Sequence, residues 1–492
     1  MAFENLEPKE VFHFFEEICN IPHGSGNLQK ISDYLVKFAK DRNLEAIQDE
    51  ELNVIIKAPG SKGYEDKEPV ILQGHMDMVA VKDDGTDIDM LNDGLKVITD
   101  GEYVWAEGTS LGGDDGIAVA YCLALLDSKD IPHPPLEVVI TTNEEVGMDG
   151  ARVIDLSPLK GKKMINIDNE EEGVFITSCA GGARVYSKVP VERQKAQGIK
   201  LKISITGLIG GHSGEMIIKG RGNANILLAR ALVEAFDAVD IMVISLDGGV
   251  ADNAIPSSAK AEVLVEKEDM DKFIESLKKT QADLKGELEG KDSDVAILVD
   301  GFELSDAGLS SHLSDSVEVT EKALTDKEGF DILSLICSMP DGVQAMSASV
   351  EGLVETSLNL GILKTTDTEV TLEQSVRSSV ESSKDYLIRK IATISASYNA
   401  EINVSGNYPG WKYRTKSQLR DHMVSVYEKM YGKKPVLQAI HAGLECGILS
   451  DKIEDLDCIS IGPDMQDIHS TKEKLSVKST ANVWEYLKEV LK

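Results

Sequence analysis

The chain has 492 residues, of which 42% are hydrophobic and 27% are charged, and its formal net charge at pH 7 is −33. This length exceeds what one ordinary hydrophobic core can hold, so two or three domains are expected. The negative charge argues against nucleic acid and anionic membrane surfaces as partners, because both would be repelled.

The remaining composition is typical of a soluble enzyme or binding protein. The first segment, MAFENLEPKEVFHFFEEICN, is acidic and amphipathic, unlike a signal peptide. No apolar run reaches the roughly 18 residues that span a bilayer. The six cysteines are scattered without a C-x-x-C pair, which favours buried thiols in a reducing compartment. We therefore expect a cytoplasmic protein.

The first candidate site follows two predicted helices (residues 10–21 and 28–40) and two short predicted strands. A third predicted strand begins at Val70 and ends in the sequence GHMD. Residues two apart in a strand point to the same side, so His75 and Asp77 face one site. A carboxylate beside an imidazole can accept the second ring N–H and make the ring a better metal ligand. An ordinary turn at the strand end is the alternative.

A glycine-rich stretch, GTSLGGDDG, then runs into an apolar helix over residues 117–126. Its glycines permit close approach of the backbone to a ligand, and Asp114 and Asp115 lie where the helix begins. A simple helix cap would need only one of these carboxylates.

Two more predicted strands end in acidic residues. The strand over 136–142 is followed by Glu144 and Glu145, and the strand over 163–167 is followed by Asp168. Two adjacent carboxylates cannot both point the same way, so one can bind a metal while the other acts as a base. A solvated acidic turn is the alternative. The carboxyl ends of strands are where α/β sheets bind ligands, and alternating strands and helices predict a mixed sheet with helices on both faces.

From about residue 188 the pattern changes to two sets of strands and helices that predict an α+β domain with a sheet covered on one face. Its first long strand ends in LIGGHSG, where His212 is either a functional residue or a turn histidine. We expect this domain over 188–410, inserted between two parts of the first domain (1–187 and 411–492). The segment 291–341 shows no recognisable chemistry.

The chain returns with a strand over 456–461 and the sequence GPDMQDIHS, which contains His469. Two imidazoles and three carboxylates now come from five strand ends or loops: His75, Asp114, Glu145, Asp168 and His469. Such a set suits a site for two metal ions, in which one carboxylate bridges the ions and a bridging water loses its proton easily.

The segments GHMDMV, GGDDG, TTNEEVG, INID, GGHSG and DIHS, in this order, resemble those of the dinuclear-zinc metallopeptidase family that includes aminoacylases, glutamate carboxypeptidases and desuccinylases. GTSLGGDDG, TTNEEVGMDGA and HAGLECGIL are more similar to its cytosolic non-specific or aminoacyl-histidine dipeptidase branch. The resemblance covers essentially the whole chain. It implies an α/β fold, with a mixed-sheet zinc-peptidase catalytic domain and an inserted α+β lid domain.

The resemblance also implies a role for each candidate in the metal site. Asp114 would bridge two divalent ions, zinc or else manganese or cobalt, and His75, Glu145, Asp168 and His469 would complete the ligand set. Asp77 would orient His75. Glu144 would take a proton from the bridging water, which attacks as hydroxide, and pass it to the departing amine.

Three lid residues would act on the substrate. In the family, the equivalent of His212 stabilises the tetrahedral oxyanion in its own site or in that of a neighbouring subunit. Asn253 and Arg377 would contact the substrate's free carboxylate, which the planar fork of an arginine suits. A surface arginine near Glu381 is the alternative for Arg377.

We therefore expect a metal-dependent dipeptidase that acts on unblocked dipeptides, including Xaa-His, and forms a homodimer through its lid. An N-acyl-amino-acid deacylase or a tripeptidase could use the same metal core. A metal-binding or peptide-binding protein without catalysis would have no need for Glu144 beside the metals.

Overall fold

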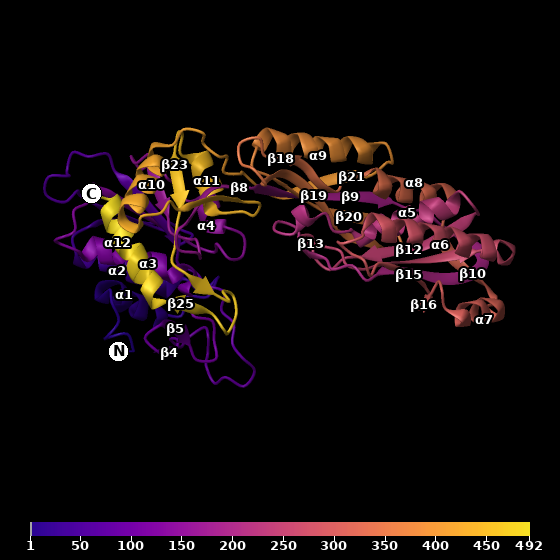
Figure 1. Cartoon of the computed structure of the whole chain (residues 1–492), viewed down its shortest axis with the longest axis horizontal. Coiled ribbons are helices and arrows are strands. Elements are labelled where there is room, and N and C mark those ends of the chain that lie inside the picture. The colour runs from indigo at the N-terminus through magenta and orange to yellow at the C-terminus, as the bar shows by residue number, and fades with distance from the viewer. Residues whose placement is uncertain (1) are drawn as a thin grey trace. The chain divides into compact units, whose positions relative to one another are not determined.

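The computed structural model describes residues 2–492 and contains two compact units (Figure 1). Unit 1 comprises the chain up to Cys179 together with Trp411–Ala439 and Leu444–Lys492, and unit 2 comprises Ala180–Gly410 and Ile440–Gly443. Unit 2 begins before residue 188, the start expected from the sequence, because the strand Gly181–Pro190 already pairs within its sheet.

Unit 1 is built on a mixed sheet of eight strands in the order β1-β2-β6-β3-β7-β23-β8-β22. The central strands β6, β3, β7 and β23 are parallel, whereas β1, β2 and β6 pair antiparallel. The carboxyl ends of β6, β3 and β7 therefore meet at one edge. In chain order the strands are β1 (Glu45–Gln48), β2 (Val54–Ala58), β3 (Val70–His75), β6 (Leu136–Thr141), β7 (Lys163–Asn166), β8 (Val174–Cys179), β22 (Val436–Ile440) and β23 (Asp457–Ser460).

Helices cover both faces of this sheet, as the sequence predicted. On one face, apolar side chains of α1, α2, α3, α10 and α12 form a core with alternate strand residues such as Leu72. Helix α11 lies on the other face. Gln73, which follows Leu72 in β3 and so points to the opposite face, donates a hydrogen bond to Glu445 of α11. The helices are α1 (Lys9–Cys19), α2 (Gln29–Asp41), α3 (Gly113–Asp127), α4 (Asp149–Val153), α10 (Gln418–Tyr431), α11 (Glu445–Lys452) and α12 (Val477–Val490).

The central helix α3 lies very close to β3, and Gly74 permits this approach. A β-carbon at Gly74 would lie 2.5 Å from Asp115 Oδ2 and 2.7 Å from Ala118 Cβ, which is closer than such atoms can come. The residue before His75 is therefore a glycine for a steric reason.

A small second sheet in unit 1 has the order β24-β25-β5-β4 and joins distant parts of the chain. Its strands are β4 (Val97–Thr99), β5 (Tyr103–Ala106), β24 (Met465–Gln466) and β25 (Lys474–Ser476). Because β25 pairs with β5, the loop before β25 lies beside the loop that follows β5.

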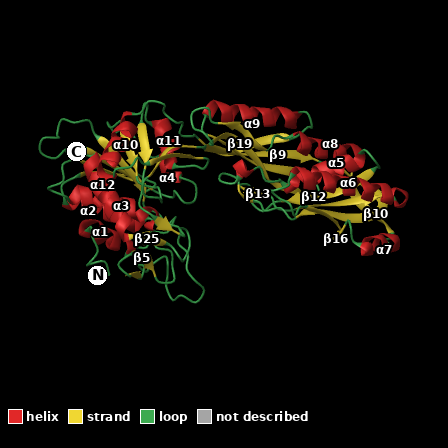
Figure 2. Ribbon diagram, in the orientation of Figure 1, coloured by secondary structure: helices red, strands yellow, loops and turns green. Residues whose placement is uncertain are grey.

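Unit 2 is built on an eleven-stranded sheet whose main path is β16-β15-β10-β14-β12-β19-β20-β9-β21, with β17 on β10 and β18 on β19. Helices α5, α6, α8 and α9 pack on one of its faces (Figure 2). The strands are β9 (Gly181–Pro190), β10 (Arg193–Thr206), β12 (Ile241–Gly248), β14 (Ala259–Val265), β15 (Ala296–Val299), β16 (Phe302–Glu303), β17 (Glu318–Leu324), β18 (Gly342–Met346), β19 (Val354–Thr365), β20 (Glu369–Ser378) and β21 (Glu401–Tyr408). The helices are α5 (Ala224–Phe236), α6 (Met270–Glu287), α7 (Ala307–Asp315), α8 (Asp326–Ser338) and α9 (Glu381–Ala396).

The same βαββαβ arrangement occurs twice in this sheet. The first set is β10-α5-β12-β14-α6-β15, and its strands lie in the order fourth, first, third, second. The second set is β9-α8-β19-β20-α9-β21 and has the same strand order, with the whole first set inserted after β9. The second strands of the two sets, β12 and β19, meet at Gly248 and Leu363.

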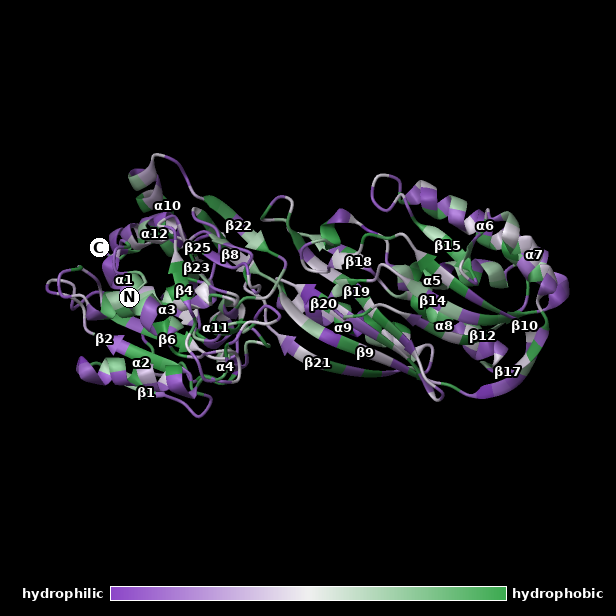
Figure 3. Cartoon of the chain, turned by 90° about the horizontal axis from the view of Figure 1, so that it is seen from below, coloured by the Kyte–Doolittle hydropathy of each residue, from purple (hydrophilic) through white to green (hydrophobic). Residues whose placement is uncertain are grey.

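Hydrophobic residues gather along the strands of unit 2, whereas helices such as α6 and α9 also show hydrophilic stretches (Figure 3). This pattern is typical of helices that bury one side against a sheet. Among residues 2–492, no helix is both long and apolar enough to cross a membrane.

Candidate metal centre

The five residues predicted as metal ligands converge in unit 1. His75 ends β3, and Glu145 and Asp168 follow β6 and β7, the two strands that flank β3 in parallel. Asp114 lies at the start of α3, and His469 lies in the loop between β24 and β25. The parallel sheet thus positions three of these side chains, and α3 and the small sheet bring the other two.

Asp114 lies between the two imidazoles. Its Oδ1 is 3.2 Å from His75 Nε2 and its Oδ2 is 3.1 Å from His469 Nε2. His75 Nε2 is also 3.5 Å from Asp168 Oδ1, and His469 Nε2 is 3.0 Å from Glu145 Oε1. Each imidazole therefore faces Asp114 and one further carboxylate, which is the arrangement of a bridged two-ion site.

Asp115 also reaches the centre, which the sequence analysis did not foresee. Ligand atoms of His75, Asp115 and Asp168 lie within 4.8 Å of one another, as do those of His75, Asp114 and Glu145. Asp115 Oδ2 accepts a hydrogen bond from the backbone N–H of His75 at 3.1 Å, and its Oδ1 is buried without a hydrogen-bond partner among the described residues. The peptide bond between Asp114 and Asp115 is cis.

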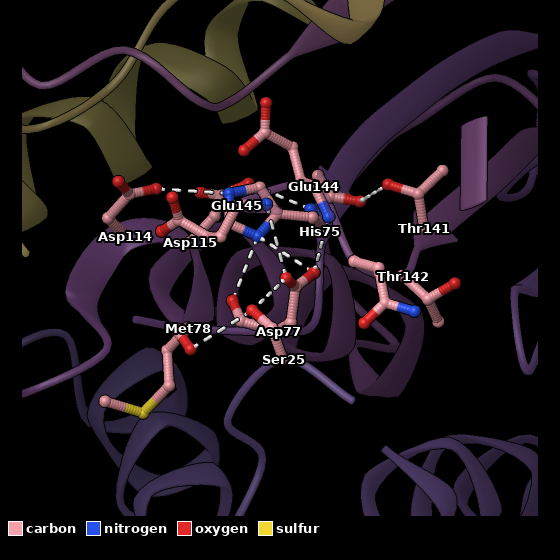
Figure 4. A network of polar contacts seen from close by, with 12 residues as sticks. Ser25, His75, Asp77, Met78, Asp114, Asp115, Thr141, Thr142, Glu144 and Glu145 are labelled. Carbon is pink, nitrogen blue, oxygen red and sulfur yellow. Dashed lines mark hydrogen bonds and ion pairs between the residues drawn. The ribbon is translucent and has the colours of Figure 1, made fainter. Parts of the chain in front are cut away.

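Asp77 connects three parts of the site (Figure 4). Its carboxylate accepts hydrogen bonds from the backbone N–H groups of Glu144 and Glu145, at 3.0 and 3.3 Å. His75 Nδ1 lies 3.0 Å from the backbone carbonyl of Asp77, closer than the 3.6 Å to its Oδ1, and the Ser25 hydroxyl donates to Asp77 Oδ2 at 2.8 Å. The predicted partner of His75 thus also fixes the turn that carries the two glutamates.

Ser25 belongs to the amino-terminal loop between α1 and α2, which the sequence analysis did not single out. The backbone N–H of Ser25 donates to the carbonyl of Met78, and the N–H of Gly26 donates to Asn143 Oδ1 at 2.8 Å. The loop therefore contacts both the His75–Asp77 strand end and the turn before Glu144. No motif in the sequence marks this contact, because it depends on backbone atoms.

Burial and mutual charge strongly perturb the ionisation of the centre. Burial alone would lower the pKa of His75, but Asp168 and Asp114 raise it well above its usual value. Hydrogen bonds to Asp114 and Glu145 raise the pKa of His469 to about 10. Burial raises the pKa of Asp168 to about 6, whereas contacts with the two imidazoles hold the pKa of Asp114 below its usual range despite burial.

Neither Glu144 nor His469 belongs to the two groups of ligand atoms that contain His75 in the described chain, but His469 faces Asp114 and Glu145 directly, at 3.1 and 3.0 Å. Burial, together with the charges of Asp168, Glu445 and Glu145, raises the pKa of Glu144 well above its usual value, against the opposing effect of His75. A carboxyl group with a raised pKa is suited to accept and return a proton near neutral pH.

A buried polar network lies beneath β3. Gln73 donates to Glu445 at 2.6 Å and accepts from Asn166 at 2.6 Å, and Thr141 also donates to Glu445 at 2.6 Å. Burial raises the pKa of Glu445 to about 8. These bonds connect α11 to the three strands that carry the candidate ligands.

The residues predicted to bind substrate lie in unit 2. His212 lies in a short strand pair opposite Ala254, and the carbonyl of Asn253 accepts from the N–H of Ser213 at 2.8 Å. Arg377 of β20 is only 9% exposed, so the alternative of a surface arginine is wrong. Its Nε and His212 Nδ1 are buried without hydrogen-bond partners among residues 2–492.

His441, which the sequence analysis did not single out, lies in the same unit. Its Nε2 is 2.7 Å from the hydroxyl of Ser357, the residue paired with Arg377 across the strands. Burial and the charge of Arg377 lower the pKa of His441 to about 3 and also lower that of His212. Both rings are therefore neutral beside a fixed positive charge.

The residues of unit 1 fit a pair of divalent cations. Their donors are imidazole nitrogens and carboxylate oxygens, the types that zinc takes, and an orphaned carboxylate oxygen of Asp115 lies buried among them. Divalent cations would also reduce the mutual repulsion of the buried carboxylates.

Comparison with known proteins supports this interpretation. The sequence profile of peptidase family M20/M25/M40 matches residues 71–492. The chain is 36% identical to the cytosol non-specific dipeptidase of Escherichia coli over 489 residues, which is 99% of this chain and 98% of that one.

Solved structures agree with this result. The aminoacylhistidine dipeptidase of Vibrio alginolyticus has a TM-score of 0.91 at 35% identity, over 100% of this chain and 98% of that one. The aminopeptidase PepT of Bacillus cereus has a TM-score of 0.56 at 15% identity, over 99% of this chain and 98% of that one, which shows a shared fold. The family resemblance and fold class predicted from the motifs are confirmed.

Zinc binding should release protons. The pKa of His469, about 10, means that this ring holds a proton at pH 7 in the metal-free protein, and the pKa of His75 is raised in the same direction. Metal ligands bind in their deprotonated form, so we expect zinc binding to release protons, about one of them from His469. Zinc affinity should rise as the pH rises toward about 10, the pKa of His469, and fall as the pH is lowered.

Calorimetric titration in two buffers of different ionisation enthalpy measures this release. His13→Gln, on the exposed side of α1, should leave the proton count unchanged, and His469→Gln should reduce it by about one. Zinc binding without proton release would contradict the ionisation described for the centre.

Proposed function

The chain belongs to peptidase family M20/M25/M40, and from this premise we propose that it is a metal-dependent dipeptidase that hydrolyses unblocked dipeptides, including Xaa-His. The observation that carries the proposal is Asp114, which lies between two imidazoles while Glu144 stays beside them as a carboxyl group outside the ligand set. A protein that only binds metal or peptide has no use for such a group.

We propose His75, Asp114, Glu145, Asp168 and His469 as the residues that hold two divalent ions, and zinc as the native metal. The mixed imidazole and carboxylate donors support zinc, and metal analysis distinguishes it from manganese and cobalt. When bound, the ions supply Lewis acidity that polarises the peptide carbonyl and makes water at the site a stronger acid.

The side chains of this chain would manage the proton. Asp77 fixes the backbone of Glu144 and Glu145, so the turn that carries the Glu144 carboxyl group is in place before substrate binds. Glu144 would take a proton from the attacking water and deliver it to the departing amine. Burial raises its pKa, which strengthens the carboxylate as a base for this proton.

We further propose that His212, Asn253 and Arg377 of unit 2 bind the substrate. The buried Nε–H group of Arg377 has no hydrogen-bond partner among the described residues, and a guanidinium suits the free carboxylate at the end of a dipeptide. A cytoplasmic location and a homodimer through the lid remain part of this proposal, and gel filtration with light scattering tests the second.

Activity should depend on bound metal. We expect two zinc ions per chain, loss of Xaa-His hydrolysis on chelation, and recovery when zinc is returned. Metal analysis and dipeptide hydrolysis before and after chelation measure this. Hydrolysis that is unchanged by chelation would contradict the proposal. A preference for N-acetyl amino acids over free dipeptides would favour a deacylase on the same metal core.

Glu144→Gln should lower kcat by about 10² to 10⁴ and leave two zinc ions bound, because the amide cannot accept the proton. Metal content and steady-state kinetics measure the two effects separately. Asp149→Asn, an exposed acidic residue in the first turn of the next helix, should retain both activity and metal. Retained activity in Glu144→Gln would exclude Glu144 as the base.

Arg377→Ala should raise KM for a dipeptide about 10- to 100-fold, because a buried charge-assisted hydrogen bond to the substrate carboxylate is lost. The same variant should lose less on a dipeptide amide, which lacks that charge. Arg389→Ala on the exposed side of α9 provides the control. An unchanged KM in Arg377→Ala would remove Arg377 from the substrate site.

A further inference from the structure

Glu473 binds the backbone of the loop that leads to Asp114. Its Oε2 accepts hydrogen bonds from the N–H groups of Leu111 and Gly112 at 2.8 and 3.1 Å. Its Oε1 accepts from Gly113 and Asp114 at 2.8 and 3.4 Å. The side chain is 3% exposed, so four successive N–H groups meet one buried carboxylate.

Such a row of N–H groups is an anion-binding concavity, and here the chain fills it with its own carboxylate. The N–H groups at the start of a helix have no partner within the helix. The loop contains Gly112 in the left-handed region and Gly113, which bring no side chains to hold it in place. Glu473 therefore supplies the contact that fixes the backbone of Asp114.

Glu473 and His469 lie on the same loop, between β24 and β25. His469 contacts the Asp114 carboxylate, and Glu473 contacts the Asp114 backbone. The pairing of β25 with β5 holds this loop beside the loop that begins after Ala106. The loop before β25 thus contacts Asp114 at two points, His469 at its carboxylate and Glu473 at its backbone N–H.

We propose that Glu473 is a positioning residue that fixes Asp114 and His469 relative to each other before metal binds. This inference rests on the proposed metal-dependent function and extends it to a residue outside the ligand set. The centre then depends on Glu473 for metal affinity, although the side chain contacts no metal.

A second buried carboxylate in unit 1 offers a matched control. Glu137 of β6 accepts from the backbone N–H groups of Lys160 and Gly161 at 2.9 to 3.0 Å and is 4% exposed. It makes the same kind of contact, but it lies near the amino end of β6, away from Glu144 and Glu145. We therefore expect loss of this contact to lower stability and to leave the candidate ligands in place.

The test compares zinc affinity in wild type, Glu473→Gln and Glu137→Gln by competition with a chromogenic chelator. Glu473→Gln presents an amide N–H₂ to two of the backbone donors, and we expect zinc affinity to fall about 10- to 100-fold. Glu137→Gln should stay within about twofold of wild type even if its Tm falls. The kcat of Glu473→Gln should recover at saturating zinc, because the ligands and Glu144 remain.

Equal zinc affinity in wild type and Glu473→Gln would overturn the inference, as would an equal loss in the Glu137→Gln control. Hydrogen exchange of metal-free wild type provides a test that needs no variant, because the N–H groups of residues 111–114 should be protected before zinc is added. Exchange there at the rate of a free loop would also overturn it. A wild type that binds no zinc would instead contradict the proposed function itself.

Discussion

The whole site depends on the hydrogen bonds of one buried carboxylate, Asp77. It accepts from Ser25 of the amino-terminal loop and from the backbone of Glu144 and Glu145, and it faces the ring of His75. A side chain without an acceptor oxygen would leave several buried donors without a partner, which costs more than the bonds themselves contribute. The ligand on β3 and the turn after β6 are therefore fixed together and cannot be adjusted independently.

A second constraint is charge. The centre crowds carboxylates into a buried space, which raises the pKa values of Asp168 and Glu144 and, through ion pairing, those of both imidazoles. In the metal-free protein, protons bound to these side chains reduce the repulsion between the carboxylates. Divalent cations can replace these protons, so the same crowding favours metal binding. In the proposed mechanism Glu144 accepts the proton because it stands outside the ligand set.

The sequence predicted the side chains at this centre because strand ends in a parallel sheet must converge, and because the motifs resemble those of a known family. It could not predict Ser25 or Glu473, whose partners are backbone groups or residues far away in the chain. It predicted two sets of strands and helices in unit 2, but not that one βαββαβ set interrupts the other, because this nesting lies in the topology of the sheet. The early start of unit 2, at Ala180, likewise depends on strand pairing that no local pattern reveals.

The order of the segments has a consequence for synthesis on the ribosome. The set β10-α5-β12-β14-α6-β15 is continuous in the chain, so it can fold while later residues are still being made. By contrast, β7 pairs with β23, and Asp114 meets His469 and Glu473 from the last part of the chain. The first set of unit 2 can therefore fold on the nascent chain long before the metal centre is complete. The centre can form only after residues 457–473 have been synthesised.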